Sequence, residues 1–294
     1  MITPEVRIAF WGTPSLTTVY LDALQKAGLT PVVIITNPDR PKGRGQEIAS
    51  PDPKVWGLAH DVAVLQPEKL DDEFYAELST YGIGLSIVVA YGSLLPQRFI
   101  DLPTHATLNV HYSLLPRYRG ASPVETAVLS GDTETGASIQ IMARALDSGP
   151  IIAESTLSIL PEETAPELRT RLTVLGAELL AQSIPAYISG QLTPKVQDES
   201  LATSCGKMRK EDGCLDLRAS GITNYRKYRA YFEWPRTYFF IDTPASSPDT
   251  PNTKLRVIIK KAHLDGETFV IDRVLPEGKK EMSYEDFKRG NPHA

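Results

Sequence analysis

The sequence contains few cysteines and no long apolar run. Cys205 and Cys214 are its only cysteines, and one such pair makes neither a disulfide framework nor a metal-binding spacing. The sequence therefore predicts no metal site and favours a reducing cytoplasm. No apolar stretch reaches the ~18–20 residues that cross a bilayer, and the N-terminus lacks the regions of a signal peptide. We expect a cytoplasmic protein with no membrane partner, and a monomer.

Several common catalytic and cofactor signatures are also absent. Gly12 is followed by Thr-Pro-Ser, so the first strand does not end in the G-x-G-x-x-G fingerprint, which argues against a nicotinamide cofactor. There is no Walker A loop and no G-x-S-x-G nucleophile elbow. Because no serine or cysteine stands in a nucleophile context, we expect direct group transfer without a covalent enzyme intermediate.

The first two thirds of the chain alternate apolar strands with helical segments. The chain has 294 residues, a length typical of two domains. Continuous apolar strands separated by helices predict an α/β fold with a parallel-rich sheet covered on both faces, as in Rossmann-like domains. The predicted strands are 6–12, 31–36, 62–67, 85–91, 106–113, 135–143 and 151–159, and the longest predicted helix is 164–190.

The pattern changes after residue 190. Residues 191–206 resemble a linker, and a short helix at 221–231 precedes three strand-like segments. We therefore predict a catalytic domain over 1–190 and a small C-terminal β-barrel over 207–294. Net charge is −5 overall, yet 207–261 hold twelve Lys and Arg against six Asp and Glu. That distribution fits a small substrate in the first domain and a polyanion on the second, or a solvated charged face.

A long basic loop follows the second predicted strand. Residues 36–51 carry Arg40, Lys42 and Arg44 together with several prolines and glycines, an unusual length for a connection in an α/β domain. One interpretation is a disordered surface loop, and the other is an arm that becomes ordered when it contacts phosphate. The sequence itself leaves both open.

An amide and an imidazole interrupt the strand at 106–113. Asn109, His111 and Ser113 should face one way in a period-two strand. Beside a cleft, Asn109 can donate a hydrogen bond to a carbonyl oxygen and His111 can accept a proton. Buried residues satisfied by backbone groups are the structural alternative. Asp147, in a Leu-Asp-Ser-Gly turn between two strands, favours catalysis because its carboxylate could orient His111.

These segments carry a resemblance to a known family. "LNVHYSLLPRYRGASPV" and the later "LDSGPII" resemble the formyltransferases that use 10-formyltetrahydrofolate. The segments "IAFWGTP", "TNPDRPKGRG", "VVAYGSLLP", "VQDES…CGKMRKEDG", "EWPRTYF" and "PEGKKEMSYEDF" narrow the resemblance to methionyl-tRNA formyltransferases. The resemblance runs from the first strand almost to the C-terminus. It implies formyl transfer from 10-formyltetrahydrofolate to the methionine of initiator Met-tRNA, in translation initiation.

The resemblance also implies roles for individual residues. Asn109 would polarise the formyl oxygen, His111 would assist proton transfer, and Asp147 would position His111. The folate would lie against Ser113, Leu114, Leu115, Pro116, Val89, Ala90, Tyr91 and Gly92. Arg44 would insert into the tRNA acceptor stem, while Arg40, Lys42, Lys207, Arg209 and Lys210 would contact its phosphates.

The sequence departs from the family pattern at two places, and two alternative functions remain. The C-terminal domain is shortened between 260–269 and 276–287, which leaves a smaller tRNA footprint. Tyr112 stands where the family has a small residue, but should point away from His111. The rivals are an N-formyltransferase of amino-sugar nucleotides and a non-catalytic RNA- or folate-binding homologue.

Overall fold

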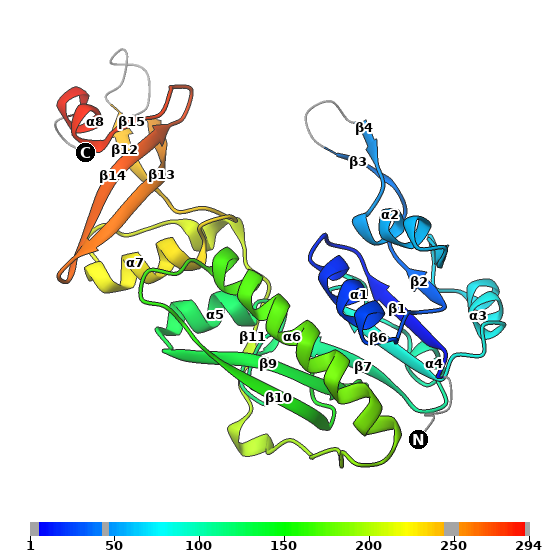
Figure 1. The fold of residues 1–294 in the computed structure, drawn as a ribbon. Coiled ribbons are helices and arrows are strands. Elements are labelled where there is room, and N and C mark those ends of the chain that lie inside the picture. The colour runs from blue at the N-terminus through cyan, green and yellow to red at the C-terminus, as the bar shows by residue number, and fades with distance from the viewer. Residues whose placement is uncertain (1–5, 43–46, 244–252, 292–294) are drawn as a thin grey trace. The chain divides into compact units, whose positions relative to one another are not determined.

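The computed structural model describes residues 6–42, 47–243 and 253–291 (Figure 1). These residues form two compact units. Unit 1 comprises Met1–Pro123, Glu134–Ser158 and Arg169–Ser204, and unit 2 comprises Val124–Thr133, Ile159–Leu168 and Cys205–Ala294. The predicted domain boundaries at 190 and 207 stay a prediction, since two internal segments of the first 190 residues group with unit 2.

Unit 1 is built around one seven-stranded sheet in the order β10-β9-β7-β6-β1-β2-β5. The pairs among β7, β6, β1, β2 and β5 are parallel, whereas β9 and β10 join antiparallel at one side. The predicted parallel-rich α/β sheet is therefore confirmed. The strands are β1 (Ile8–Gly12), β2 (Val33–Ile35), β5 (Ala63–Leu65), β6 (Leu85–Val89), β7 (Ala106–His111), β9 (Glu134–Ile141) and β10 (Ile151–Ser158).

Helices cover both faces of this sheet, because alternate residues of the buried strands point to opposite sides. Ile8 and Phe10 of β1 share one core with residues of α1 (Thr17–Lys26), α2 (Asp52–Ala59) and α6 (Ala165–Ile188). Ala9 and Trp11 share the other core with residues of α3 (Asp72–Ser79) and α4 (Gln97–Ile100). Fully buried strands of this kind require the continuous apolar runs seen in the sequence.

The basic loop at 36–51 contains a short hairpin that the sequence did not reveal. β3 (Arg40–Lys42) pairs antiparallel with β4 (Glu47–Ala49), and Arg40 lies opposite Ala49. Strands containing proline and charged residues give little periodic signal. β8 (Arg119–Gly120) pairs with the two-residue strand β11 (Ser204–Cys205), and a 3₁₀ turn spans Glu199–Leu201.

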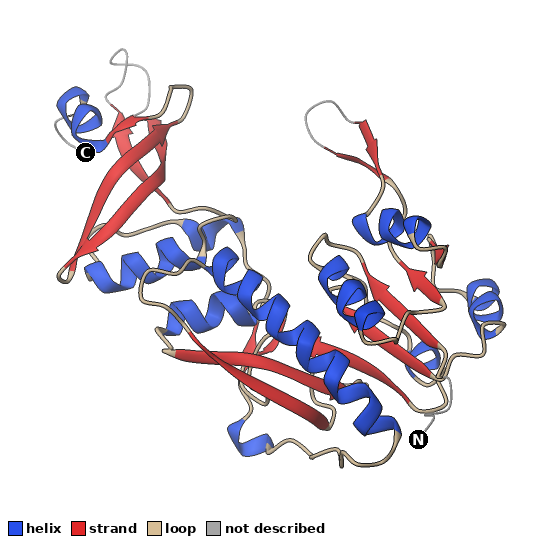
Figure 2. Ribbon diagram, viewed as in Figure 1, coloured by secondary structure: helices blue, strands red, loops and turns tan. Residues whose placement is uncertain are grey.

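Unit 2 contains a four-stranded antiparallel sheet in the order β12-β13-β14-β15, drawn in red in Figure 2. Its strands are β12 (Tyr238–Thr243), β13 (Thr253–Asp265), β14 (Thr268–Pro276) and β15 (Met282–Ser283). Tyr228 of α7 (Gly221–Ala230) and Phe287 of α8 (Tyr284–Gly290) belong to the core that this sheet shares with its helices. α5 (Pro123–Ser130) and a 3₁₀ turn over Lys210–Gly213 complete the unit. The sheet is consistent with the predicted small C-terminal barrel.

Candidate active site

The carboxyl ends of β1, β6 and β7 meet where the strand order changes direction. From β1 the chain proceeds outward to β2 and β5, then returns to place β6 on the other side of β1. In open α/β sheets, ligands bind beyond the carboxyl ends of strands at such a switch point. Gly12, Val89 and His111 are the last residues of these three strands. The site is therefore expected at their ends.

Asn109 and His111 lie in the last three residues of β7. Asn109 lies opposite Val88 of β6 and Gln140 of β9, and His111 lies opposite Ser138 of β9. Two residues apart in a strand, their side chains point to the same face of the sheet. His111 is only 6% exposed. An imidazole with so little access to water depends on protein groups for its hydrogen bonds.

Asp147 reaches the same place from the turn between β9 and β10. Its backbone adopts the left-handed conformation, with φ of 51°, which is strained for a residue with a side chain. Two residues later Gly149 passes against β9, where an added Cβ would lie 1.7 Å from the carbonyl oxygen of Ile141. The Leu-Asp-Ser-Gly sequence thus lets the turn fold tightly enough to aim Asp147 at β7.

The three predicted catalytic side chains come together. Asp147 Oδ2 lies 3.6 Å from His111 Nδ1, and Asn109 Nδ2 donates to Asp147 Oδ1 at 3.5 Å. Both separations are long for hydrogen bonds, so a small movement or a bridging water would complete them. Their catalytic roles stay a prediction, but the geometry places an amide, an imidazole and a carboxylate at one sheet edge.

Two further groups, which the sequence analysis did not predict, donate hydrogen bonds to the Asp147 carboxylate. Gln140 Nε2 donates to Oδ1 at 2.9 Å, and the backbone N–H of Gly120 donates to Oδ2 at 2.9 Å. Gln140 faces Asn109 across the β7–β9 pair, so its position in an apolar strand was the available signal. Its Oε1 is buried without a hydrogen-bond partner among the described residues. The Gln140 side chain thus points its NH₂ group toward the Asp147 carboxylate, and its Oε1 accepts no hydrogen bond from the described residues.

The ring of His111 lies between two oxygen acceptors. Its Nε2 lies 2.9 Å from the carbonyl oxygen of Tyr118. A carbonyl oxygen can only accept, so Nε2 carries the hydrogen and Nδ1 faces Asp147. Nδ1 is then the nitrogen that can take up a proton, and the carboxylate stands ready to stabilise it.

A small cavity adjoins Asp147, with a volume of about 90 Å³. Leu94 and Leu146 at its edge are 85% and 62% exposed. The other residues lining it are Leu95, Ile100, Gln140, Met142, Ala143, Arg144 and Asp147. Ligand pockets usually exceed ~300 Å³, so the cavity holds one ring at most unless the two exposed leucines move. An apolar slot beside a carboxylate suits a flat heterocycle with N–H groups.

The predicted folate segment Val89–Gly92 leads directly into this cavity wall. Val89 and Tyr91 are buried in the two cores, and burial raises the pKa of Tyr91 to about 12. Ala90 and Gly92 have positive φ and are exposed. The chain thereby turns outward from β6 toward Leu94. Val89, Ala90, Tyr91 and Gly92 as folate contacts stay a prediction.

The second predicted folate segment, Ser113 to Pro116, forms a tight loop after β7. β7 ends at His111, so Ser113 does not continue the strand. Ser113 is buried, its Oγ donates to the Arg117 carbonyl at 2.6 Å, and Leu115 N donates to Ser138 Oγ at 3.1 Å. Leu114 packs over Gly136, and Pro116 is half-buried. These bonds give the segment a structural task, and its contact with folate stays a prediction.

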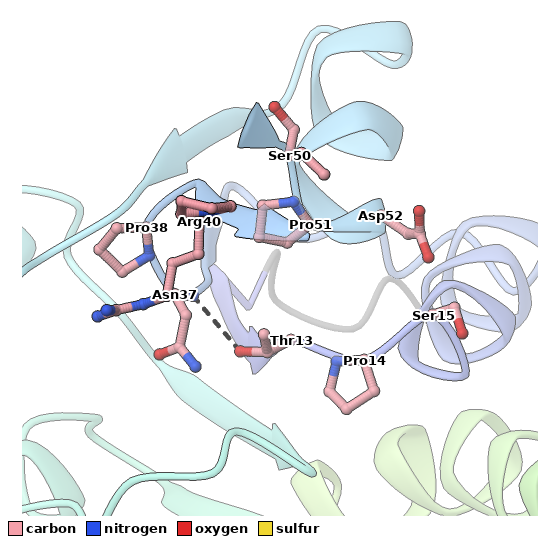
Figure 3. Close-up of a pocket in the computed structure, with 11 residues that line it drawn as sticks. Thr13, Pro14, Ser15, Asn37, Pro38, Arg40, Ser50, Pro51 and Asp52 are labelled. Carbon is pink, nitrogen blue, oxygen red and sulfur yellow. Dashed lines mark hydrogen bonds between the residues drawn. The ribbon is translucent and has the colours of Figure 1, made fainter. Parts of the chain in front are cut away.

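A larger cavity of about 290 Å³ lies at the base of the β3–β4 hairpin (Figure 3). Thr13, Asn37, Arg40, Ser50 and Asp52 line it together with several prolines. Thr13 Oγ1 accepts a hydrogen bond from Asn37 N at 3.4 Å, which joins the ends of β1 and β2. The predicted tRNA-contact residue Arg40 therefore lies on the wall of a pocket near the end of β1.

Asp39 anchors this hairpin to the rest of unit 1. Its carboxylate accepts hydrogen bonds from Lys54 Nζ at 2.7 Å, Gln66 Nε2 at 2.8 Å and Ser50 Oγ at 3.1 Å. The bond from Lys54, followed by that from Gln66, lowers the pKa of Asp39. The segment before Arg40 is therefore fixed at a carboxylate that stays ionised near neutral pH.

The remaining predicted tRNA contacts are Lys42 and Arg44 of the basic loop and three residues of unit 2. Lys42 belongs to β3 by its backbone, and Arg44 lies outside the described residues. Lys207, Arg209 and Lys210 are exposed in unit 2. Their exposure is compatible with contact to a phosphate backbone, and these roles stay a prediction.

The described residues contain neither a metal-ligand cluster nor a membrane-spanning helix. In the part of the chain that the structure describes, no cluster of His, Cys, Asp and Glu could hold a metal ion. No helix of residues 6–42, 47–243 and 253–291 is long and apolar enough to cross a membrane.

Solved structures share this fold at low sequence identity. An N-formyltransferase from Helicobacter canadensis, crystallised with folinic acid and dTDP-3-aminofucose, is 16% identical with a TM-score of 0.63, over 90% of this chain and 95% of that one. Glycinamide ribonucleotide transformylase 1 from Symbiobacterium toebii is 19% identical with a TM-score of 0.56, over 66% of this chain and 96% of that one. At such identities these likenesses show the fold.

Sequence relatives specify the family. The formyl transferase family matches residues 6–184. The methionyl-tRNA formyltransferase of Myxococcus xanthus is 37% identical over 97% of this chain and 95% of its own length, and that of Acidobacterium capsulatum is 35% identical over 97% of both. The Stutzerimonas stutzeri enzyme is 41% identical over 80% of this chain and 75% of its own length. The chain therefore belongs to the methionyl-tRNA formyltransferases, within the formyl transferase family.

Proposed function

We propose that the protein transfers the formyl group of 10-formyltetrahydrofolate to the α-amino group of methionine on initiator Met-tRNA. The methionyl-tRNA formyltransferases that resemble it over nearly their whole length support this activity. The single structural observation that carries it is the convergence of Asn109, His111 and Asp147 at the carboxyl end of β7. A binding protein without catalysis has no need of that arrangement.

The residues around the cavity fit the folate cosubstrate. Leu95 and Met142 offer apolar contact to a flat ring. Gln140 Oε1 is fully buried and has no partner among the described residues, so it would accept from a ring N–H only once the cavity opens and uncovers it. When bound, 10-formyltetrahydrofolate supplies the formyl carbon. Leu94 and Leu146 would have to move aside, because about 90 Å³ does not hold the whole molecule.

Asn109 acts on the oxygen of the formyl group. As the amine attacks, negative charge develops on that oxygen, and the Asn109 NH₂ donates a hydrogen bond to it. A pre-positioned donor at such an oxygen lowers the barrier by roughly 3 kcal/mol. In the structure this NH₂ lies at the limit of hydrogen bonding to Asp147, at 3.5 Å. It is therefore free to turn to the substrate at little cost.

His111 and Asp147 handle the proton that the α-amine loses as its bond to the formyl carbon forms. The bond between the formyl carbon and the cosubstrate nitrogen breaks in return, and that nitrogen gains a proton as tetrahydrofolate leaves. Nε2 is committed to the Tyr118 carbonyl, so the proton is held at Nδ1, next to the Asp147 carboxylate at 3.6 Å. Asp147 stays fixed because Gln140 and Gly120 N also donate to it. The carboxylate thus orients the ring and stabilises the positive charge that forms on it.

Basic residues provide the contacts to tRNA. Arg40 lines the cavity at the hairpin base, and Lys42 and Arg44 follow it in the sequence. In unit 2, the exposed Lys207, Arg209 and Lys210 contact phosphates without reading base sequence. We place the protein in the cytoplasm, where its two cysteines, Cys205 and Cys214, would stay reduced. The monomeric state stays a prediction that sedimentation equilibrium tests.

The decisive experiment is mass spectrometry of Met-tRNA after incubation with 10-formyltetrahydrofolate. We expect N-formylmethionine with the wild-type protein and none above background with His111→Ala. Tyr112→Phe is the matched control, because the Tyr112 hydroxyl is bonded to Tyr20 and Thr173 and not to the site. Formylation of an aminodeoxy sugar nucleotide in place of Met-tRNA would support the rival sugar N-formyltransferase instead.

A further inference from the structure

One segment of the methionyl-tRNA formyltransferase resemblance has no role in the site as described so far. Val-Gln-Asp-Glu-Ser, at 196–200, lies within residues 195–204, which we call the strap. The strap begins beside β10, where Lys195 and Ile151 exchange two backbone hydrogen bonds of 2.8 Å. It then contacts two loops that carry catalytic groups, the turn at 145–149 and the loop at 116–120.

Gln197 is the buried centre of the strap. Its Nε2 donates to the carbonyl oxygen of Asp147 at 2.9 Å and to that of Gly149 at 2.7 Å. Its Oε1 accepts from Nε of Arg119 at 3.0 Å and from NH2 of the same guanidinium at 2.7 Å. Two donors and two acceptor positions are all that a glutamine amide has. The residue is 6% exposed, and every hydrogen bond it can make joins the Asp147 turn to Arg119.

The hydrogen bonds of Gln197, together with the chain from Arg119 to Gly120, form a ring of contacts that starts and ends at Asp147. Gln197 holds the Asp147 backbone and the Arg119 side chain, while the residue after Arg119, Gly120, donates its N–H to Asp147 Oδ2 at 2.9 Å. Glu199 completes the path from outside by accepting from both terminal nitrogens of Arg119 at 2.8 and 2.9 Å. Hydrogen bonds therefore hold Asp147 both at its backbone carbonyl and at its carboxylate. Together they fix the position of Oδ2, the oxygen nearest His111.

The strap also fixes the partner of the other His111 nitrogen. Thr203 Oγ1 accepts from Tyr118 N at 2.8 Å, and its carbonyl accepts from Arg119 N at 2.9 Å. The Tyr118 carbonyl receives His111 Nε2. Tyr118 and Asp147 both have left-handed φ, at 57° and 51°. Such conformations persist only where neighbouring contacts hold them, and here residues of the strap bond both.

We propose that Gln197 is a positioning residue for formyl transfer, acting through the Asp147 carboxylate and through Arg119. The inference rests on the proposed function, because positioning has meaning only for a working site. It implies that the strap sets the His111–Asp147 geometry without touching either substrate. Loss of Gln197 should therefore lower kcat and leave both KM values nearly unchanged.

The test compares wild type with Gln197→Leu, which keeps the volume and removes all four hydrogen bonds. With Met-tRNA and 10-formyltetrahydrofolate we expect kcat to fall at least about tenfold, with both KM values within about twofold, as for lost transition-state positioning. The amide of Gly120 is a second readout that does not depend on activity. In a spectrum of protein labelled with ¹⁵N-glycine, we expect its resonance to shift as it does in Asp147→Asn.

Asn224→Ala is the matched structural control. Asn224 is another buried amide that donates to a backbone carbonyl, that of Asp216 at 2.9 Å, and it lies in unit 2. It should lower Tm comparably while leaving the Gly120 resonance in place. Wild-type kcat in Gln197→Leu, an unmoved Gly120 resonance, or a rise in KM that accounts for the whole loss each overturns the proposal.

A second variant covers the case in which Gln197→Leu does not fold. Arg119→Lys keeps the charge but cannot bind Gln197 Oε1 through two guanidinium nitrogens. We expect a smaller fall in kcat and a Gly120 shift in the same direction, and the absence of both overturns the proposal. If the wild type does not formylate Met-tRNA, the proposed function fails, while the Gly120 resonance still reports whether Gln197 holds the Asp147 turn.

Discussion

Gly149→Ala isolates the contribution of the tight turn that carries Asp147. The added Cβ would lie 1.7 Å from the Ile141 carbonyl oxygen, and real Cβ contacts stay beyond 3.0 Å, so one backbone must retreat by 1.3 Å, the difference between the two. Neither can do so freely, because Ile141 N donates to the Pro150 carbonyl at 2.8 Å and Gly149 O accepts from Gln197 at 2.7 Å. The displacement therefore passes to Asp147.

The expected effect is large on turnover and moderate on stability. A misplacement of about 1 Å in a catalytic constellation costs roughly a hundredfold in rate, and overpacking costs ~1–3 kcal/mol of folding free energy. Initial rates of formyl-Met-tRNA formation at saturating substrates measure the first, and thermal unfolding measures the second.

Gly190→Ala is the control for an ordinary glycine replacement. Gly190 has a positive φ, 75°, and no described heavy atom outside its own neighbours in the chain lies within 4 Å of an added Cβ. It should lose about 1 kcal/mol of stability and keep its kcat. If Gly149→Ala also keeps kcat to within about threefold, the reasoning that links backbone approach at Gly149 to the catalytic carboxylate is refuted.

The remaining predictions concern the amide donor and the hairpin anchor. Asn109→Ala should lower kcat about a hundredfold or more through loss of its bond to the formyl oxygen, measured by single-turnover formylation, and unchanged turnover would remove its assigned role. Asp39→Asn should raise KM for Met-tRNA several-fold with kcat preserved, because the Lys54 ion pair that fixes the hairpin is lost; an equal loss in kcat would contradict an anchoring role. Because Lys54 and Gln66 lower the pKa of Asp39, this anchor is present above the ordinary aspartate value and is lost only as pH falls through the lowered pKa. KM of the wild type should accordingly show no Asp39 titration over roughly pH 5–8, and a midpoint near 6 that disappears in Asp39→Asn would contradict the anchor.

Much of unit 1 was predictable because its strands are buried on both faces. Runs such as Ile8–Gly12 and Leu85–Val89 are buried at every position and, apart from Ser86, contain no polar side chain, as a sheet covered on both faces requires. Asn109 and His111 stood out against that background, since polar side chains in a buried strand need a reason. The Leu-Asp-Ser-Gly turn between two strands then indicated Asp147 as the partner of His111, and the resemblance to folate-dependent formyltransferases implied the same pair.

Other parts had no local signal. Period-two alternation placed Ser113 beside His111, but β7 ends at His111 and Ser113 turns inward to the Arg117 carbonyl. The β3–β4 hairpin contains proline and charged residues, so neither its pairing nor the Asp39 anchor followed from propensity. The short helix α2 (Asp52–Ala59) was also not predicted, because no side-chain N-cap indicates where its eight residues begin.

The amino-acid sequence by itself determined the layered sheet, the small second β-rich domain, and the identity of the amide, imidazole and carboxylate. These follow from apolar periodicity and from residue types, which are local properties of the chain. Only the tertiary structure decided how the Asp147 carboxylate is held, because Gln140, Gly120 and Gln197 act on it from distant points of the sequence. Hydrogen bonds between such segments form only after the folded backbone brings them within about 3 Å of each other. The residues next to Asp147 in the sequence therefore do not indicate which distant residues will contact it.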